Sequence, residues 1–152
     1  MNSPGVKFPP PLIFVTGFLA GLALERWVYR TSLGPRGTLA AAGWALAIAA
    51  IAFAGWGMVT FWRARTAIIP HRPASNLVRH GPYRFTRNPM YVGLTGLYTG
   101  LALMFNVGWP LVMLPFVLVG LWVLVIRREE RYLLAAFGKE YAAFQREVRR
   151  WL

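Results

Sequence analysis

A basic, proline-broken segment runs directly into a long apolar stretch at residues 81–91, and it carries side chains that could do chemistry. Non-helical backbone lies against a bilayer only where protein or a water-filled cavity covers it. A second polar cluster, Arg127-Arg128-Glu129-Glu130, stands at the far end of the same apolar hairpin. The first segment alone is equally consistent with a functional site and with a basic loop that leads into a proline-started helix. Together, the two clusters predict a site for a polar ligand.

The composition is that of a membrane protein, because 57% of the 152 residues are hydrophobic and only 14% are charged. Lysine and arginine exceed aspartate and glutamate by 17 to 5, which gives a formal net charge of +12. The positive residues flank apolar stretches. We therefore expect anionic lipid headgroups, and not nucleic acid, as their partner.

Several other kinds of site are excluded or disfavoured by what the chain lacks. It contains no cysteine, which excludes disulfides, thiolate catalysis and zinc–thiolate sites. His71 and His80 stand nine residues apart without supporting carboxylates, so no metal site is predicted. No strand is followed by a Gly-x-Gly-x-x-Gly turn, which excludes a soluble nucleotide-binding domain. Any chemistry must therefore be built on helices and the loops that join them.

Four stretches are apolar and long enough to cross a bilayer of roughly 30 Å. They predict one all-α integral membrane domain over residues 1–152, in which the last two spans form a tight helical hairpin. The third span is short and is expected to borrow a turn from residues 88–90. The expected spans are about 12–28, 39–62, 91–105 and 109–126, with a cofactor loop at 63–90 and a helical tail at 127–152.

The basic residues predict the orientation of these spans. Fourteen of the 17 lie on one side of the membrane in the four-span arrangement, and three lie on the other. Loops rich in lysine and arginine stay in the cytoplasm. We therefore expect both termini and the active site to face the cytoplasm of a bacterial inner membrane. The sequence gives no indication of the oligomeric state.

Small residues and proline predict how the spans pack. Glycines recur at four-residue spacing in the first and third spans, as Gly17 with Gly21 and Gly96 with Gly100. This spacing lets helix backbones approach closely in lipid. Pro115 lies inside the fourth span, where it removes one backbone hydrogen bond and favours a kink.

The tail is predicted to be an amphipathic helix. Its apolar residues are spaced by three or four, which places them on one face of a helix. Such a helix would lie in the membrane interface or fold back over the cytoplasmic end of the bundle. Gly138 is expected to separate it from the continuation of the fourth span. The apolar residues of the stripe are Phe137, Tyr141, Phe144, Val148 and Trp151.

At the other end of the molecule, Glu25 is expected to form an interfacial ion pair with Arg26.

Residues 76–93 resemble the isoprenylcysteine carboxyl methyltransferase and phospholipid methyltransferase group. The resemblance is carried by Asn76-Leu77-Val78, by Gly81-Pro82-Tyr83, by Arg87-Asn88-Pro89-Met90-Tyr91-Val92-Gly93, and by Glu129-Glu130 with Phe137-Gly138-Lys139-Glu140-Tyr141. It covers about residues 60 to 150. It implies an integral-membrane enzyme that uses S-adenosylmethionine without a nucleotide-binding domain of the soluble type.

The resemblance also implies which residues form the site. The cofactor would be held by the loop before the third span and the segment after the last one, while a lipophilic acceptor enters sideways from the bilayer. Residues implied in catalysis are Arg87, Asn88 and Glu130. Residues implied in cofactor binding are Leu77, Val78, Tyr83, Asn88, Pro89, Met90, Tyr91 and Glu129.

Two departures from the prenylcysteine enzymes bear on the acceptor. Arg87-Asn88-Pro89 stands where those enzymes often have Arg-His-Pro, so an amide that cannot titrate replaces an imidazole. The place of an arginine assigned to the prenylcysteine carboxylate is apolar here, near Val125. The acceptor thus remains open between an isoprenylcysteine-type carboxylate, a lipid amine and a small thiol. Only the amine must lose a proton, for which Glu130 is available.

The residue types suit this cofactor on chemical grounds. Carboxylates can bind its amino group or ribose hydroxyls, while Arg87 or free N–H groups at the start of the third span can bind its carboxylate. Tyr83 and Tyr91 can face the adenine or the sulfonium.

Two other functions remain open. A small four-span transporter of cationic drugs would need an ionisable residue near the bilayer midplane, and Glu25 falls too near a span end. A membrane reductase with a nicotinamide cofactor would need more basic contacts to phosphate from longer loops.

Overall fold

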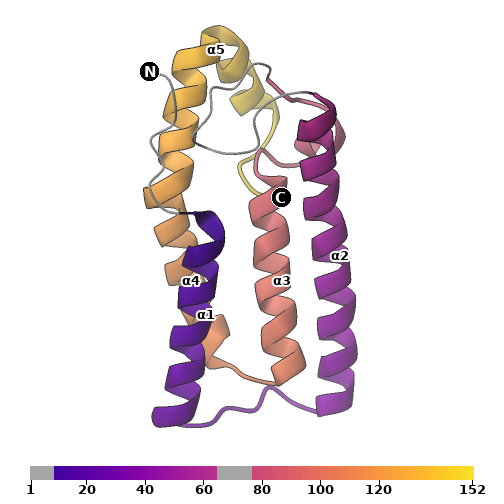
Figure 1. Cartoon of the computed structure of the whole chain (residues 1–152), viewed down its shortest axis with the longest axis vertical. Helices are drawn as coiled ribbons and strands as arrows, with labels where there is room; N and C mark the ends of the chain where they lie inside the picture. Colours follow the sequence, from indigo (N-terminus) through magenta and orange to yellow (C-terminus); the bar gives the residue numbers. More distant parts are fainter. Residues whose placement is uncertain (1–8, 65–76) are drawn as a thin grey trace.

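The computed structural model describes residues 9–64 and 77–152, and within these ranges the chain is helical with no strand (Figure 1). This confirms the all-α class. The long helices run antiparallel in chain order, so that both the start of α3 and the whole of α5 lie at the same end of the bundle. The elements are α1 (Pro10–Trp27), α2 (Arg36–Arg63), the 3₁₀ turn η1 (Gly81–Arg84), α3 (Pro89–Phe105), α4 (Trp109–Leu121), the π-helical turn η2 (Trp122–Ile126) and α5 (Arg127–Glu147).

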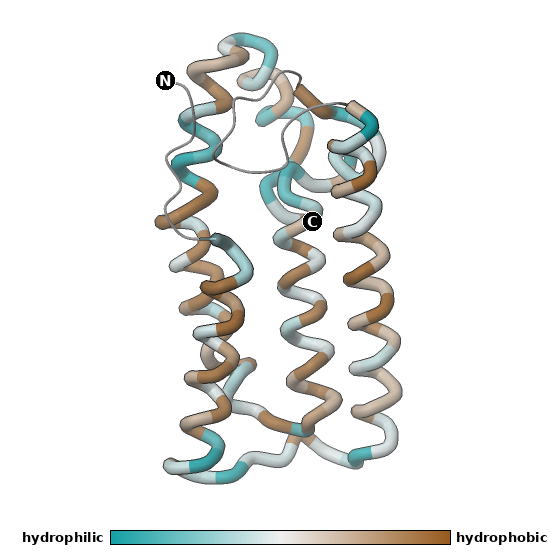
Figure 2. Tube along the Cα trace, viewed as in Figure 1, coloured by the Kyte–Doolittle hydropathy of each residue, from teal (hydrophilic) through white to brown (hydrophobic). Residues whose placement is uncertain are grey.

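Two of the described helices are long and apolar enough to cross a membrane by length and composition. They are α2, with 28 residues, and the continuous helix Trp109–Glu147, with 39 residues. The helix α3, Pro89–Phe105, is apolar but shorter. Figure 2 shows hydrophobic residues along the helices and hydrophilic ones gathered at both ends of the bundle. The molecule is thus a membrane protein, and the number of spans stays a prediction.

Proline sets where several helices begin. Proline fits the first turn of a helix, because the N–H that it lacks would have no partner there. Pro10, Pro89 and Pro110 each lie in the first turn of a helix. The start of α3 at Pro89 also confirms that the third apolar stretch borrows a turn from residues 88–90.

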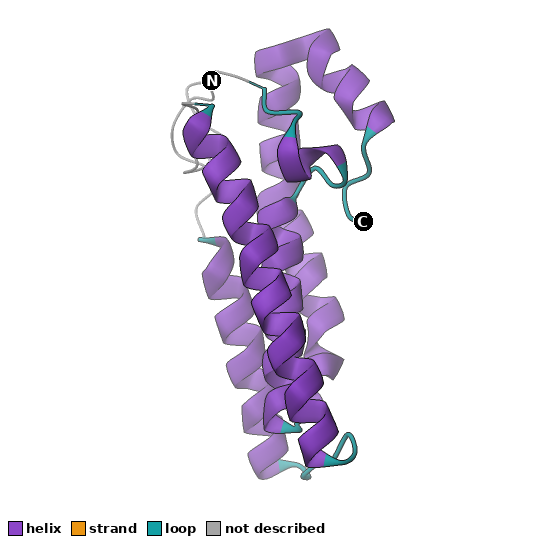
Figure 3. Ribbon diagram, turned by 90° about the vertical axis from the view of Figure 1, so that its right-hand side faces the viewer, coloured by secondary structure: helices purple, strands orange, loops and turns teal. Residues whose placement is uncertain are grey.

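The bundle consists of two closely packed helix pairs, α2 with α3 and α1 with α4 (Figure 3). A Cβ atom added at Gly43 would lie 2.6 Å from the carbonyl oxygen of Gly100, and one added at Gly21 would lie 2.6 Å from the backbone of Pro110. Glycine therefore allows both close approaches, as predicted for Gly21 and Gly100. The short turn 106–108 joins α3 to α4, yet each packs mainly against another helix.

The loop between α1 and α2 is fastened to the turn between α3 and α4. The Glu25 carboxylate accepts hydrogen bonds from the backbone N–H and the hydroxyl of Thr31, and Asn106 accepts one from the N–H of Leu33 at 2.7 Å. The predicted ion pair of Glu25 with Arg26 is therefore wrong. The reason is that the backbone donors of this loop need acceptors, and the carboxylate supplies one.

The long C-terminal helix bends back on itself at Gly138, whose φ of 50° and ψ of −120° are not helical. Beyond the bend, Tyr141 and Phe144 are buried against Val78 and Tyr83. The bend confirms the predicted break, and the apolar stripe packs on the protein's own loop. The prediction that the stripe stays helical to Trp151 is wrong. Helix α5 ends at Glu147, and Val148 is extended with ψ 132°.

Substitution of Gly43 by alanine should destabilise the α2–α3 pair, because the added methyl group would meet backbone. Overpacking of this kind typically costs about 1–3 kcal/mol. Gly55, on the same helix, has nothing within 4 Å of an added Cβ. We therefore expect Gly43→Ala to lower the thermal midpoint in detergent micelles and Gly55→Ala to leave it unchanged or raise it. Equal midpoints for the two variants would contradict this packing.

Candidate active site

The turn η1 fixes Tyr83 at the top of α2. Gly81 has a φ of 64°, which only glycine adopts readily, and a Cβ there would lie 2.8 Å from the hydroxyl of Thr60. This close approach brings the Tyr83 ring edge-on to Phe61, with ring centroids 4.9 Å apart. Tyr83 is consequently almost fully buried, at 5% exposure.

A partly buried carboxylate lies against two tyrosines. The hydroxyl of Tyr91, in the first turn of α3, donates to both oxygens of Glu129, in the first turn of α5, at 2.8 and 3.0 Å. Burial raises the pKa of Glu129 to about 7, the Tyr91 hydrogen bond opposes this rise, and the charge of Glu130 adds to it. Burial, with a smaller contribution from the Glu129 charge, raises the pKa of Tyr83. Tyr83, Tyr91 and Glu129 thus form one cluster.

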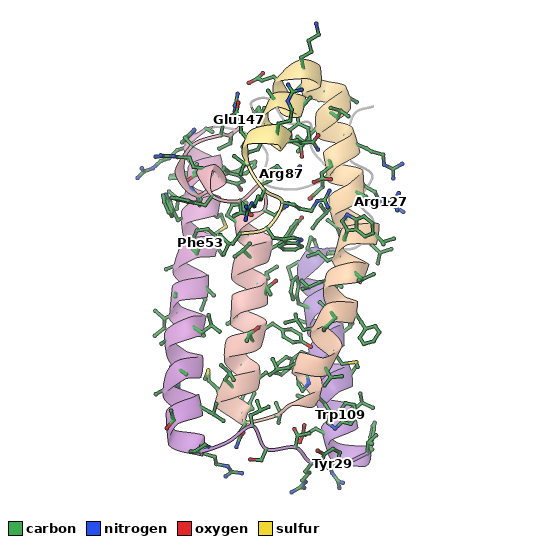
Figure 4. The ribbon with its side chains drawn as sticks, turned by 180° about the vertical axis from the view of Figure 1, so that it is seen from behind. Tyr29, Phe53, Arg87, Trp109, Arg127 and Glu147 are labelled. Atoms are coloured by element: carbon green, nitrogen blue, oxygen red, sulfur yellow. The ribbon has the colours of Figure 1, made fainter. Side chains whose placement is uncertain are left out.

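The neighbouring carboxylate, Glu130, is held by two arginines. Arg87 donates to one oxygen at 2.9 Å, and Arg150 donates from Nε and Nη2 to both oxygens at 2.9 and 2.8 Å. One negative charge thus faces two positive ones. The Arg87 side chain is only 10% exposed, and its Nε has no hydrogen-bond partner within the described residues. Figure 4 labels Arg87 at the α5 end of the bundle.

Residues 148–152, which we call the strap, lie beside the start of α3 (Figures 1 and 3). The N–H of Arg87 donates to the carbonyl of Arg149 at 2.9 Å. The carbonyl of Arg150 accepts from the Thr86 hydroxyl and from the Asn88 side-chain amide, each at 3.0 Å. Asparagine is a preferred helix cap, yet Asn88 makes no side-chain cap to α3, and its side-chain NH2 group donates to the strap.

The structure therefore brings the predicted residues into two adjoining groups. Tyr83, Tyr91 and Glu129 form the first group, and Arg87, Asn88 and Glu130 join the strap in the second. The remaining predicted residues pack elsewhere. Leu77 and Val78 belong to the apolar cluster under α5, and Pro89 and Met90 lie against Gly57 of α2. Asn76 lies outside the described residues.

Thr86 and Arg150 belong to the site although the sequence does not single them out. Thr86 is fully buried and bonds both the strap and the N–H of Asn88, at 3.0 and 3.1 Å. Arg150 stands beside Arg149 in a basic tail, and no local pattern distinguishes the two. The signal in the sequence that could have pointed to Thr86 is a hydroxyl residue in an otherwise basic loop.

A groove on the outer face of α4 leads to the strap. It has a volume of about 250 Å³ and is lined by Leu118, Val119, Trp122, Arg150 and Trp151. Beside it, the Arg127 guanidinium lies over the Trp122 ring at 5.2 Å. The groove is apolar along the helix and cationic at the end nearest Glu130.

Comparison with known proteins supports one family. A family model described as phospholipid methyltransferase matches residues 38–140. The match contains the loop before α3, both members of the Tyr91–Glu129 pair, and Glu130. No curated protein and no solved structure matches the chain significantly.

The Glu129 carboxyl should titrate near neutral pH. Its pKa in the folded protein, about 7, lies above the ordinary 4.5. The folded protein therefore binds this proton more tightly than the unfolded chain does, so that its contribution to stability falls as the pH rises from 4.5 towards 7. Infrared difference spectra should show a protonated carboxyl that disappears around pH 7 and is missing in Glu129→Gln. Tyr91→Phe removes the hydrogen bond that lowers this pKa, so its midpoint should be higher. A midpoint near 4.5 in the wild type would contradict the burial of Glu129.

Proposed function

The chain belongs to the phospholipid methyltransferase family, and from this premise we propose that it transfers a methyl group from S-adenosylmethionine to a lipophilic acceptor. The observation that carries the proposal is the partly buried Tyr91–Glu129 pair with the buried Tyr83 beside it. This pair adjoins a charge cluster at one end of a bundle of apolar helices. Burial of ionisable groups in such surroundings costs free energy. Groups of this kind are therefore typical of binding and catalytic sites.

The residues of the site fit S-adenosylmethionine. The Nε of Arg87, which has no hydrogen-bond partner in residues 9–64 and 77–152, is a buried donor that suits a carboxylate. Glu129, ionised above a pH of about 7, suits the amino group. The faces of Tyr83 and Tyr91 suit the adenine or, by cation–π attraction, the sulfonium. This chain offers a partner for each polar part of the cofactor.

When bound, S-adenosylmethionine supplies a methyl group that the sulfonium has already activated. The protein's own residues have to hold the two reactants in line and keep water out. Alignment alone can be worth roughly 7–11 kcal/mol. Tyr91 orients Glu129 through two hydrogen bonds, and the packing of Tyr141 and Phe144 over Tyr83 excludes water from one side.

The acceptor is proposed to arrive from the bilayer along α4. The groove beside Trp122 is apolar for most of its length, which suits a hydrocarbon chain. A thiolate or carboxylate acceptor needs no base, whereas an amine has to lose a proton. Glu130 is the carboxylate left for that role once Glu129 binds the cofactor. In the structure Glu130 is occupied by Arg87 and Arg150.

The end of the bundle that carries α5 is proposed to face the cytoplasm of a bacterial inner membrane. The fold brings most described basic residues to this end, where anionic headgroups would meet them. Lys7, Arg65 and Arg72, which also count towards the predicted orientation, lie outside the described residues.

Binding of S-adenosylmethionine to the purified protein tests this function most directly. Glu129→Gln keeps the side-chain volume and removes the charge that faces the amino group. Loss of a charge-assisted hydrogen bond costs on the order of 1.5–3 kcal/mol, or about a tenfold to hundredfold weaker affinity by calorimetry. The matched control is Glu140→Gln, an exposed residue of the same helix, and its affinity should equal that of the wild type. Wild-type affinity in Glu129→Gln would show that this carboxylate does not bind the cofactor.

A further inference from the structure

Arg150 stands between the groove on α4 and the partly buried carboxylate Glu130. Its guanidinium binds both oxygens of Glu130, and the same residue lines the cationic end of the groove. Its side chain is 36% exposed, against 10% for Arg87 and 14% for Glu130. Arg150 is therefore the member of this cluster that a molecule in the groove meets first.

The charges of the cluster do not balance. Glu130 carries one negative charge and is paired with two guanidiniums, so one positive charge remains within this group of three, next to a Glu129 carboxyl whose pKa is raised to about 7. Arg127, stacked on Trp122 beside the groove, adds another. Arginine binds phosphate through two parallel hydrogen bonds, as it binds a carboxylate. The head of the groove thus complements a phosphate at the end of a hydrocarbon chain.

The attachment of the strap permits Arg150 to exchange Glu130 for another partner. It is extended rather than helical, and three hydrogen bonds from Arg87, Thr86 and Asn88 to its carbonyls hold its backbone to the start of α3. Its residues are exposed or only partly buried, with Val148 and Trp151 packed at the edges of the two apolar clusters. Segments of this kind open at lower free-energy cost than the core. If a phosphodiester replaced Glu130 on Arg150, Glu130 would keep Arg87, and no buried charge would lose its only partner.

We propose that Arg150 determines acceptor specificity: it binds the phosphate of a lipid acceptor in the groove, and in doing so it frees the Oε2 atom of Glu130, which Arg87 does not contact, to face that acceptor. The hydrocarbon chain lies along Leu118, Val119 and Trp122. Glu130 then becomes available to take a proton from an amine acceptor. The role in acceptor specificity rests on the proposed methyl transfer. The exchange of Glu130 for phosphate on Arg150 is a binding event that does not require the transfer.

Movement of the strap can be measured without the cofactor. The chain contains no cysteine, so the exposed pair Glu140→Cys and Leu152→Cys can carry two spin labels as unique sites. Electron–electron distances in detergent micelles should change on addition of phosphatidylethanolamine. They should not change with diacylglycerol of the same chains, nor with soluble glycerophosphoethanolamine at the same concentration. An equal response to diacylglycerol would overturn the role of phosphate, and a full response to the soluble compound would overturn the role of the lipid chain.

Variants of Arg150 link the movement to specificity. Arg150→Gln should abolish the phosphate-dependent distance change and raise the KM for a phosphate-bearing acceptor about tenfold or more, with the KM for a phosphate-free acceptor unchanged. Arg150→Lys keeps the charge without the two-pronged geometry and should give an intermediate KM. Arg146→Gln, an exposed arginine of α5, is the matched control and should behave as wild type. A wild-type lipid response in Arg150→Gln would overturn the proposal. Absence of methyl transfer from every acceptor would refute the proposed function alone, because the distance measurement does not depend on it.

Discussion

Compensation of the Glu130 charge is the interaction on which the α5 end of the molecule depends. A carboxylate next to apolar helices is costly unless it is paired and hydrogen-bonded, and its partners come from far apart in the sequence. Arg87 precedes α3, Glu130 opens α5, and Arg150 follows the end of α5. One charge cluster therefore joins the loop, the long helix and the strap. It also sets the place of Glu129, the preceding residue, against Tyr91.

The helices are predictable from the sequence because their causes are local. Apolar stretches bounded by prolines locate α1 and α3 to within two residues and place the start of α4 at residue 109, and Gly138 marks the bend in α5. Which helices pack against each other is harder to predict from the sequence. The turn between α3 and α4 is short, which favours a hairpin, yet the glycines of α3 lie against α2 and α4 packs on α1. Helix partners depend on which faces fit, and spacing alone does not reveal that.

The site is predictable in its residue types and only partly in its contacts. The resemblance selects Tyr91, Glu129 and Glu130, and these do lie together, although no pattern near them indicates that Tyr91 bonds one carboxylate and Arg87 the other. Pro89 and Met90 belong to the same motif but pack on α2. Arg150 is beyond prediction, because it differs from Arg149 only in the direction that the chain takes after α5 ends.

The π-helical turn η2 separates two parts of one continuous helix. Each residue of an α-helix advances the side chain by about 100°, and a π turn accommodates one additional residue, so the helix beyond it is rotated relative to the helix before it. One side of Trp109–Leu121 can therefore face lipid and α1. Glu129 and Glu130 project from a different side of the continued helix, towards α3 and the strap. The orientation of the carboxylates is thus set independently of the orientation of the apolar helix before the π turn. Loss of a single residue within Trp122–Ile126 would remove that independence and turn both carboxylates away together.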